Sequence, residues 1–268
     1  MIFTKKIKRT EEEGLSFWEH LEELRSILIK CVIYVTIGFI ISFFFKNFIF
    51  DVIILGPTKP YFITNRAFCY IASLWNMPEL CLNQIPVKLM SINMTSQFAV
   101  HINISLISGF IIAMPLILYQ IWKFLKPALL PKEKKYISKA VFASSILFFI
   151  GVLFSYYILV PLTVHFFSNY QVSPVVENRI NITSFISSIT SVIFFTGLIF
   201  ELPVITYFLV KTGILKAETL IKARKYIIIL ILFISAIITP PDILSQIIVS
   251  IPIFALYELS IFIAKKQH

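Results

Sequence analysis

A single acidic residue stands in the middle of a long apolar stretch of this sequence. In "FFTGLIFELPVITYFLV", residues 194–210, Glu201 is the only charged residue. Burying an unpaired charge is costly, and a carboxylate inside a membrane-spanning segment marks, by default, a functional polar site that has a partner. The alternative is structural, namely a protonated Glu that is hydrogen-bonded to a neighbouring helix. The sequence leaves both interpretations open.

The surroundings of Glu201 are also polar. Helical spacing puts it on one face with Thr190 and Gly197, so we expect its carboxyl group to face protein or water rather than lipid. Pro203 follows two residues later. Because proline has no N–H, it leaves the carbonyl group of Ile199 without its helical partner, and we expect a local polar defect beside the acid.

Other charged residues flank the apolar runs. Glu22, Glu23 and Arg25 precede the first run, and Glu133 lies among lysines in "LLPKEKK". Taken singly, such residues are usually solvated surface charges.

The segment "TPPDILSQ", residues 239–246, resembles a turn that opens a helix. Its double proline suits the first helical positions, and Asp242 then lies near the positive helix N-terminus. Gln246, one turn further into an otherwise apolar helix, has no such simple explanation. The sequence contains no HExxH, GxSxG or P-loop motif and no Cys/His metal spacing, so we expect neither an enzyme nor a cofactor or metal site.

The composition indicates the elements that hold these residues. Of the 268 residues 58% are hydrophobic and 14% charged, with a mean hydropathy of +0.87, which is typical of an integral membrane protein. The net charge of +10 does not indicate nucleic-acid binding, because a basic excess in a membrane protein usually lies in the loops that face the cytoplasm. The first apolar run is too long for the core of a signal peptide, so we expect no cleavable one.

Six apolar runs predict an all-α membrane protein with six transmembrane helices in a single polytopic domain, 1–268. They lie at residues 27–45, 98–122, 140–164, 188–210, 226–239 and 243–264. Residues 1–25 then form a cytoplasmic N-terminal segment, whose capping-box spacing predicts a helix that begins near Phe17. Both termini are expected in the cytoplasm, because 19 of the 24 Lys and Arg residues then lie inside. The last two helices form a short hairpin, since fourteen residues at 226–239 are fewer than the ~20 that a bilayer needs.

The first outer loop, residues 46–96, is predicted to fold as an extramembrane cap with short helices. Its four prolines interrupt any span, yet it is too apolar for a free linker. It also contains Cys69 and Cys81. An outer location permits a disulfide between them, but their separation is not given by the sequence, so a bonded pair and two free thiols are both open.

Several motifs occur in the order typical of one family. They are "HLEELR" before the first span, "LYQIWKFLKPALLPKEKKY" after the second, "FELP" in the fourth, and "TPPDILSQ" and "LYE" in the last hairpin. Over essentially its whole length the chain resembles TatC, the receptor subunit of the twin-arginine protein translocase. It departs from the family pattern at Ile27, where a second basic residue is common, and at Gln97, His101 and Asn103, where charges are common.

The resemblance implies a function and assigns roles. The protein would bind twin-arginine signal peptides of folded precursors at its cytoplasmic face, in a bacterial inner membrane or an organellar one, as part of a homo-oligomeric receptor complex. The resemblance implies an arginine-binding patch formed by Glu23, Glu133, Arg25 and Phe124. It implies that Glu201 and Gln246 dock single-span partners of the TatA/TatB type. It also implies that Pro57 and Asp242 shape the cap and the hairpin.

Two other functions remain open on the sequence. One is a proton- or ion-coupled secondary transporter with Glu201 as the relay, and the other is a purely structural membrane subunit. The guanidinium group binds a carboxylate through a planar fork that lysine cannot reproduce, so binding of an Arg-Arg but not a Lys-Lys peptide would separate the receptor from both.

Overall fold

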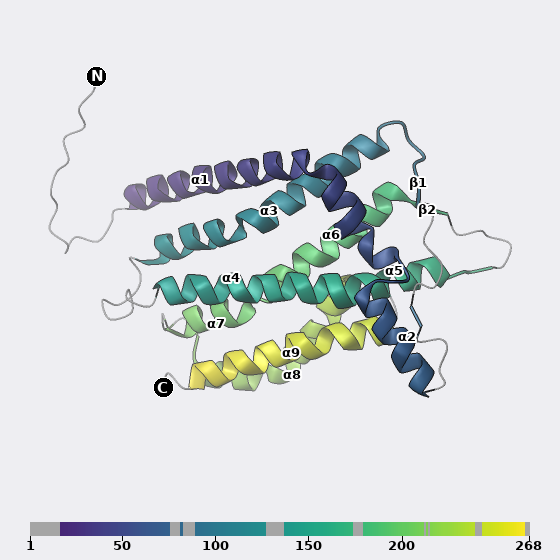
Figure 1. Ribbon diagram of the computed structural model, residues 1–268. Helices are drawn as coiled ribbons and strands as arrows, with labels where there is room; N and C mark the ends of the chain where they lie inside the picture. The colour runs from purple at the N-terminus through teal and green to yellow at the C-terminus, as the bar shows by residue number, and fades with distance from the viewer. Residues whose placement is uncertain are drawn as a thin grey trace, which may run out of the picture.

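The structure is a computed structural model that describes residues 17–75, 81–82, 89–126, 137–173, 179–211, 213, 215–238 and 243–265. Its longest helices run side by side, as Figure 1 shows, and α2 crosses them at one end. The helices are α1 (Phe17–Phe44), α2 (Ile63–Trp75), α3 (Ser96–Leu125), α4 (Ile137–Phe154), α5 (Val160–Asn169), α6 (Ile182–Ile199), α7 (Leu202–Lys211), α8 (Ala217–Ile238) and α9 (Ile243–Lys265). The all-α prediction is confirmed, with β1 (Leu89–Met90) and β2 (Ile180–Asn181) as a two-residue parallel pairing.

Within the part of the chain that the structure describes, four helical stretches are long and apolar enough to cross a membrane. They are Leu21–Phe44, Ser96–Leu125, Ile137–Asn169 and Ile182–Lys211, and Gln246–Phe262 is a shorter apolar helix. The described part of α1 starts at Phe17, and Ser16, on which the capping-box prediction depends, lies outside the described residues. α8 begins at Ala217 rather than at residue 226, because its first turns carry charged residues that a search for apolar runs leaves out.

The third and fourth stretches are not uniform helices. Between α4 and α5 the chain forms a π-helix, η6 (Ser155–Leu159), without leaving the helical path. Between α6 and α7 it makes a turn at Phe200 and Glu201. The first loop contains the short helices predicted for it, a π-helix η1 (Phe48–Ile54), a 3₁₀ turn η2 (Gly56–Thr58) and α2.

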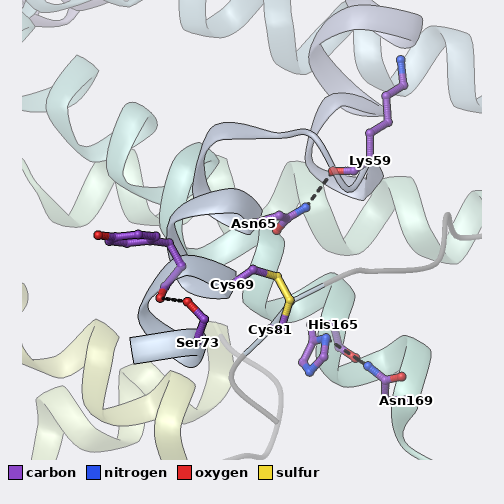
Figure 2. The surroundings of a disulfide bond; sticks show 8 residues. Lys59, Asn65, Cys69, Ser73, Cys81, His165 and Asn169 are labelled. Atoms are coloured by element: carbon purple, nitrogen blue, oxygen red, sulfur yellow. Dashed lines mark hydrogen bonds between the residues drawn. A yellow bond between two sulfur atoms is a disulfide. The ribbon is translucent and has the colours of Figure 1, made fainter. Parts of the chain in front are cut away.

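Side-chain hydrogen bonds and a disulfide anchor this first loop. Asn65, fully buried, donates through Nδ2 to the carbonyl oxygen of Pro57 at 3.0 Å. It also donates to the carbonyl oxygen of Lys59 at 2.9 Å (Figure 2). The hydroxyl of Tyr156 in η6 donates to the carbonyl of Ile53 at 2.9 Å. Pro57 is thus a buried residue of the 3₁₀ turn, consistent with a role in shaping this loop.

The two loop cysteines form a disulfide. Figure 2 shows the bond joining Cys69 on α2 to Cys81. The sequence left this pairing open, and the structure decides for the bonded form. Cys31, on α1, is free.

α1 packs chiefly against α3, and two glycines make this contact possible. A Cβ atom added at Gly38 would lie 2.4 Å from the carbonyl oxygen of Gly109, and one added at Gly109 would lie 2.4 Å from the backbone nitrogen of Phe39. Both obstacles are backbone atoms, which cannot rotate away. Small residues let helix backbones approach in this way where the hydrophobic effect does not drive helices together in lipid.

We expect Gly109→Ala to loosen the contact between α1 and α3. The added methyl group would force the two backbones apart, and overpacking of this kind typically costs about 1–3 kcal/mol. Thermal unfolding of the protein in detergent should show a lowered midpoint. The control is Ile37→Ala, next to Gly38 but 51% exposed, which should change the midpoint less. An unchanged midpoint for Gly109→Ala would contradict the close crossing.

Candidate functional site

Glu201 lies at the turn where one helix stops and the next begins. Its backbone N–H donates to the carbonyl of Leu198 at 3.1 Å, a three-residue turn that ends α6. Its own carbonyl accepts from the N–H groups of Val204 and Ile205, both at 3.0 Å, which starts α7. Pro203 occupies the first turn of α7, where a missing N–H is tolerated. A two-residue turn at Phe200 and Glu201 therefore separates α6 from α7 beside the predicted defect.

The carboxyl group of Glu201 is buried against α4. The residue is 5% exposed, and the hydroxyl of Ser144 on α4 donates to Oε2 at 2.7 Å. Ser144 is itself 1% exposed. Within the described residues, Oε1 of Glu201 has no hydrogen-bond partner. The side chain thus faces protein rather than lipid, as its helical position predicts, and one of its two acceptor oxygens is buried without a partner.

Two glycines hold α4 and α6 close enough for this contact. A Cβ atom added at Gly151 would lie 2.7 Å from Cγ of Phe200, and one added at Gly197 would lie 2.9 Å from Cε2 of Phe148. The aromatic rings of Phe148 and Phe200 fill the space that the glycines leave, and both rings are buried. The carboxyl group is therefore set in a tightly packed apolar wall, in which an unpaired polar atom is costly.

Gln246 lies in a different place, in the hairpin of α8 and α9. Its Nε2 donates to the carbonyl of Leu232 on α8 at 3.0 Å. The same two helices are joined by an ion pair between Arg224 and Glu258 at 2.7 Å. Gln246 and Glu201 therefore have separate hydrogen-bond partners. Asp242, predicted at the turn of this hairpin, lies outside the described residues.

The described residues assigned to the arginine patch lie near the start of α1 and at the end of α3. Glu23 is half-buried and Arg25 exposed near the start of α1, and Phe124 is half-buried in the last turn of α3. Figure 1 shows these two helix ends on the same side of the molecule. Glu133 lies outside the described residues, in the segment that connects α3 to α4.

Ser144 is the site residue that the sequence did not reveal. It lies in the run 140–164, in which hydroxyl side chains can bond the backbone of their own helix, as Ser145 does with the carbonyl of Val141 at 2.9 Å. Nothing in the spacing distinguishes the two serines. Which of the two serines faces Glu201 depends on how α4 packs against α6, and that packing is not given by the sequence.

The chain is similar throughout to proteins of one family. The family model described as Sec-independent protein translocase protein (TatC) matches residues 19–252. The chain belongs to the TatC family. Proteins named Sec-independent protein translocase protein TatC include one from Blattabacterium sp. subsp. Periplaneta americana, 36% identical over 96% of this chain and 97% of its own length, and one from Aquifex aeolicus, 35% identical over 92% and 93%.

Solved structures of TatC agree with the fold. A crystal structure named Twin Arginine Translocase Receptor TatC superimposes with a TM-score of 0.68 at 34% identity, over 92% of this chain and 98% of that one. A second, in the detergent DDM, gives a TM-score of 0.72. As a TatC-family protein the chain is a membrane component of protein transport by the Tat pathway, a translocase component rather than an enzyme.

Removal of the Ser144 hydroxyl should destabilise this TatC-family protein. In Ser144→Ala, Oε2 of Glu201 stays buried without a donor, which costs about 1–3 kcal/mol. Ser145→Ala is the matched control, because Ser145 bonds only the backbone of its own helix. Denaturant unfolding of the purified protein should separate the two variants. Combination with Glu201→Gln tests the pairing, and full additivity of the two changes would argue against it.

Proposed function

We propose that this TatC-family protein is the receptor subunit of a twin-arginine translocase. It binds the paired arginines of signal peptides at its cytoplasmic face and docks single-span partners of the TatA/TatB type within the membrane of a bacterium. Support comes from the match over nearly the whole chain to a protein named Twin Arginine Translocase Receptor. The observation in the fold that carries the proposal is that the start of α1, which bears Glu23, and the end of α3, which bears Phe124, lie on the same side of the molecule (Figure 1).

The arginine site rests on the chemistry of two carboxylates. Glu23 lies near the start of α1, and Glu133 follows α3 in the sequence, outside the described residues. Each carboxylate can accept two parallel N–H bonds from one guanidinium group, and a lysine ammonium cannot reproduce this fork. Phe124, which is half-buried at the end of α3, supplies an apolar surface beside the site. Arg25, which is exposed near the start of α1, limits the excess of negative charge there.

The docking site rests on Oε1 of Glu201, which is buried and has no hydrogen-bond partner among the described residues. In hydrocarbon no water satisfies such a group, so a partner helix that displaces the side chains covering it and carries a donor gains a hydrogen bond at this point. Homo-oligomeric assembly into a receptor complex, with both termini in the cytoplasm, completes the proposal.

The arginine site predicts a charge-specific loss of binding. Glu23→Ala and Glu133→Ala should each weaken binding of an Arg-Arg signal peptide about tenfold or more, because hydrogen bonds to charged groups contribute about 1.5–3 kcal/mol. Glu22→Ala is the control, since Glu22 is the exposed neighbour of Glu23. Crosslinking of a precursor to the protein in membranes measures binding. A Lys-Lys peptide should bind the unaltered protein as weakly as the Arg-Arg peptide binds the variants.

The docking site predicts separation of binding from transport. Glu201→Ala should leave precursor binding intact, because Glu201 lies within the fourth stretch, away from the helix ends that carry the arginine site, and should impair transport of the bound precursor. Glu201→Gln, which keeps a polar group, should impair it less. Vesicles with a pH gradient and partner subunits provide the assay. If the purified protein alone took up a small solute, and Glu201→Ala abolished this uptake, the secondary-transporter function would be correct instead.

A further inference from the structure

A cavity of about 490 Å³ opens beside the end of α1, between η1 and the first turns of α3. Its volume is that of an ordinary small-molecule site. The candidate membrane-crossing stretches Leu21–Phe44 and Ser96–Leu125 end and begin near the residues that line it, which corresponds to the depth of lipid headgroups. It is distinct from the Glu201 site and from the helix ends that carry the proposed arginine patch.

The cavity carries one positive and one negative side chain. Lys46 and Asp51 both line it and both are exposed. Asp51 lies in the π-helix η1, and Lys46 lies two residues before that helix begins. Neither forms an ion pair with another described residue. A ligand that bears an anion and a cation a few bonds apart would satisfy both.

Uncharged polar groups complete the lining. Ser42 is 1% exposed, lines the cavity, and its hydroxyl has no hydrogen-bond partner among the described residues. A buried hydroxyl without a partner is costly, so a bound ligand that accepts from it would recover free energy. His101 forms a fixed wall, because its Nε2 lies 3.1 Å from the carbonyl oxygen of Phe43 and its ring stacks on that of Phe43 at 4.0 Å. Gln97 adds amide donors at the rim.

Apolar side chains border the polar part. Phe98, 62% exposed, lines the cavity together with Phe50 and the buried Ile104. A small soluble zwitterion has no apolar part that would contact these side chains. A lipid, by contrast, places its headgroup among the charges and its glycerol and acyl chains along the rings.

We propose that this cavity binds the phosphoethanolamine headgroup of a phospholipid. The phosphate accepts hydrogen bonds from Lys46, Gln97 and Ser42, and the primary ammonium donates to the carboxylate of Asp51. Charge-assisted hydrogen bonds at both ends give selectivity. A choline headgroup lacks the N–H donors for Asp51, and a glycerol headgroup lacks the cation, so the carboxylate would repel its phosphate.

The test is binding of defined lipids to the delipidated full-length protein in detergent, measured by native mass spectrometry. Phosphatidylethanolamine should bind more tightly than phosphatidylcholine and phosphatidylglycerol. Lys46→Gln and Asp51→Asn should each weaken phosphatidylethanolamine binding about tenfold, whereas Asp51→Asn should leave phosphatidylglycerol binding unchanged or stronger. Arg66→Gln, an exposed charge on α2 outside the cavity, is the matched control and should bind all three lipids as the unaltered protein does.

Three results would overturn the proposal. Equal affinity of the unaltered protein for the three lipids would remove headgroup recognition. Loss of binding in Lys46→Gln but not in Asp51→Asn would mean a site for the phosphate alone. Binding of free phosphoethanolamine as tightly as of the lipid would mean a soluble ligand. Both variants change exposed side chains, and an unchanged unfolding temperature confirms that they are folded.

Discussion

The hydrocarbon of a membrane offers no water to a polar group, so polar groups at irregular positions of the helices need partners within the protein. Where α6 breaks, the backbone carbonyl of Glu201 is taken up by the first N–H groups of α7, and its carboxylate by Ser144. Where the third stretch widens into a π-helix, the carbonyl of Tyr157 accepts from the hydroxyl of Thr64 in the first loop. At both irregular places a neighbouring helix or loop supplies a hydrogen bond, although Oε1 of Glu201 has no partner among the described residues.

Close contacts between glycines serve the same constraint by a different route. Lipid tails compete with apolar side chains for each helix surface, so packing must come from shape. The crossing of Gly38 with Gly109 joins α1 to α3, and Gly151 and Gly197 join α4 to α6. The second pair also brings Ser144 within reach of Glu201. The protein thus places its one deeply buried carboxyl contact, among the described residues, where two helices already approach closely.

The sequence predicts the helices well because the same constraint governs their composition. Long apolar runs locate the membrane-crossing stretches, and the position of Glu201 on a polar face predicts its burial. The sequence does not predict the partner of Glu201, because Ser144 and Ser145 are equivalent until α4 packs on α6. It left the pairing of Cys69 with Cys81 open for the same reason, since a disulfide depends on a distance between segments. Charged first turns concealed the true start of α8.

The short pairing of β1 with β2 has a consequence for the alignment of the bundle. Leu89 is matched to Ile180 just before α3 and α6 begin, so the two strands bring the starts of these helices to one level. Asn103 lies seven residues after the first residue of α3, and Thr190 eight after that of α6. The Thr190 hydroxyl shares its proton between the carbonyl oxygen of Ile186 in its own helix, at 2.7 Å, and Asn103 Oδ1, at 3.2 Å. The β1–β2 pairing and the contact between Thr190 and Asn103, about two turns into the helices, therefore oppose any sliding of α3 along α6. A vertical offset of one residue would break both together, so these helices share one height in the membrane.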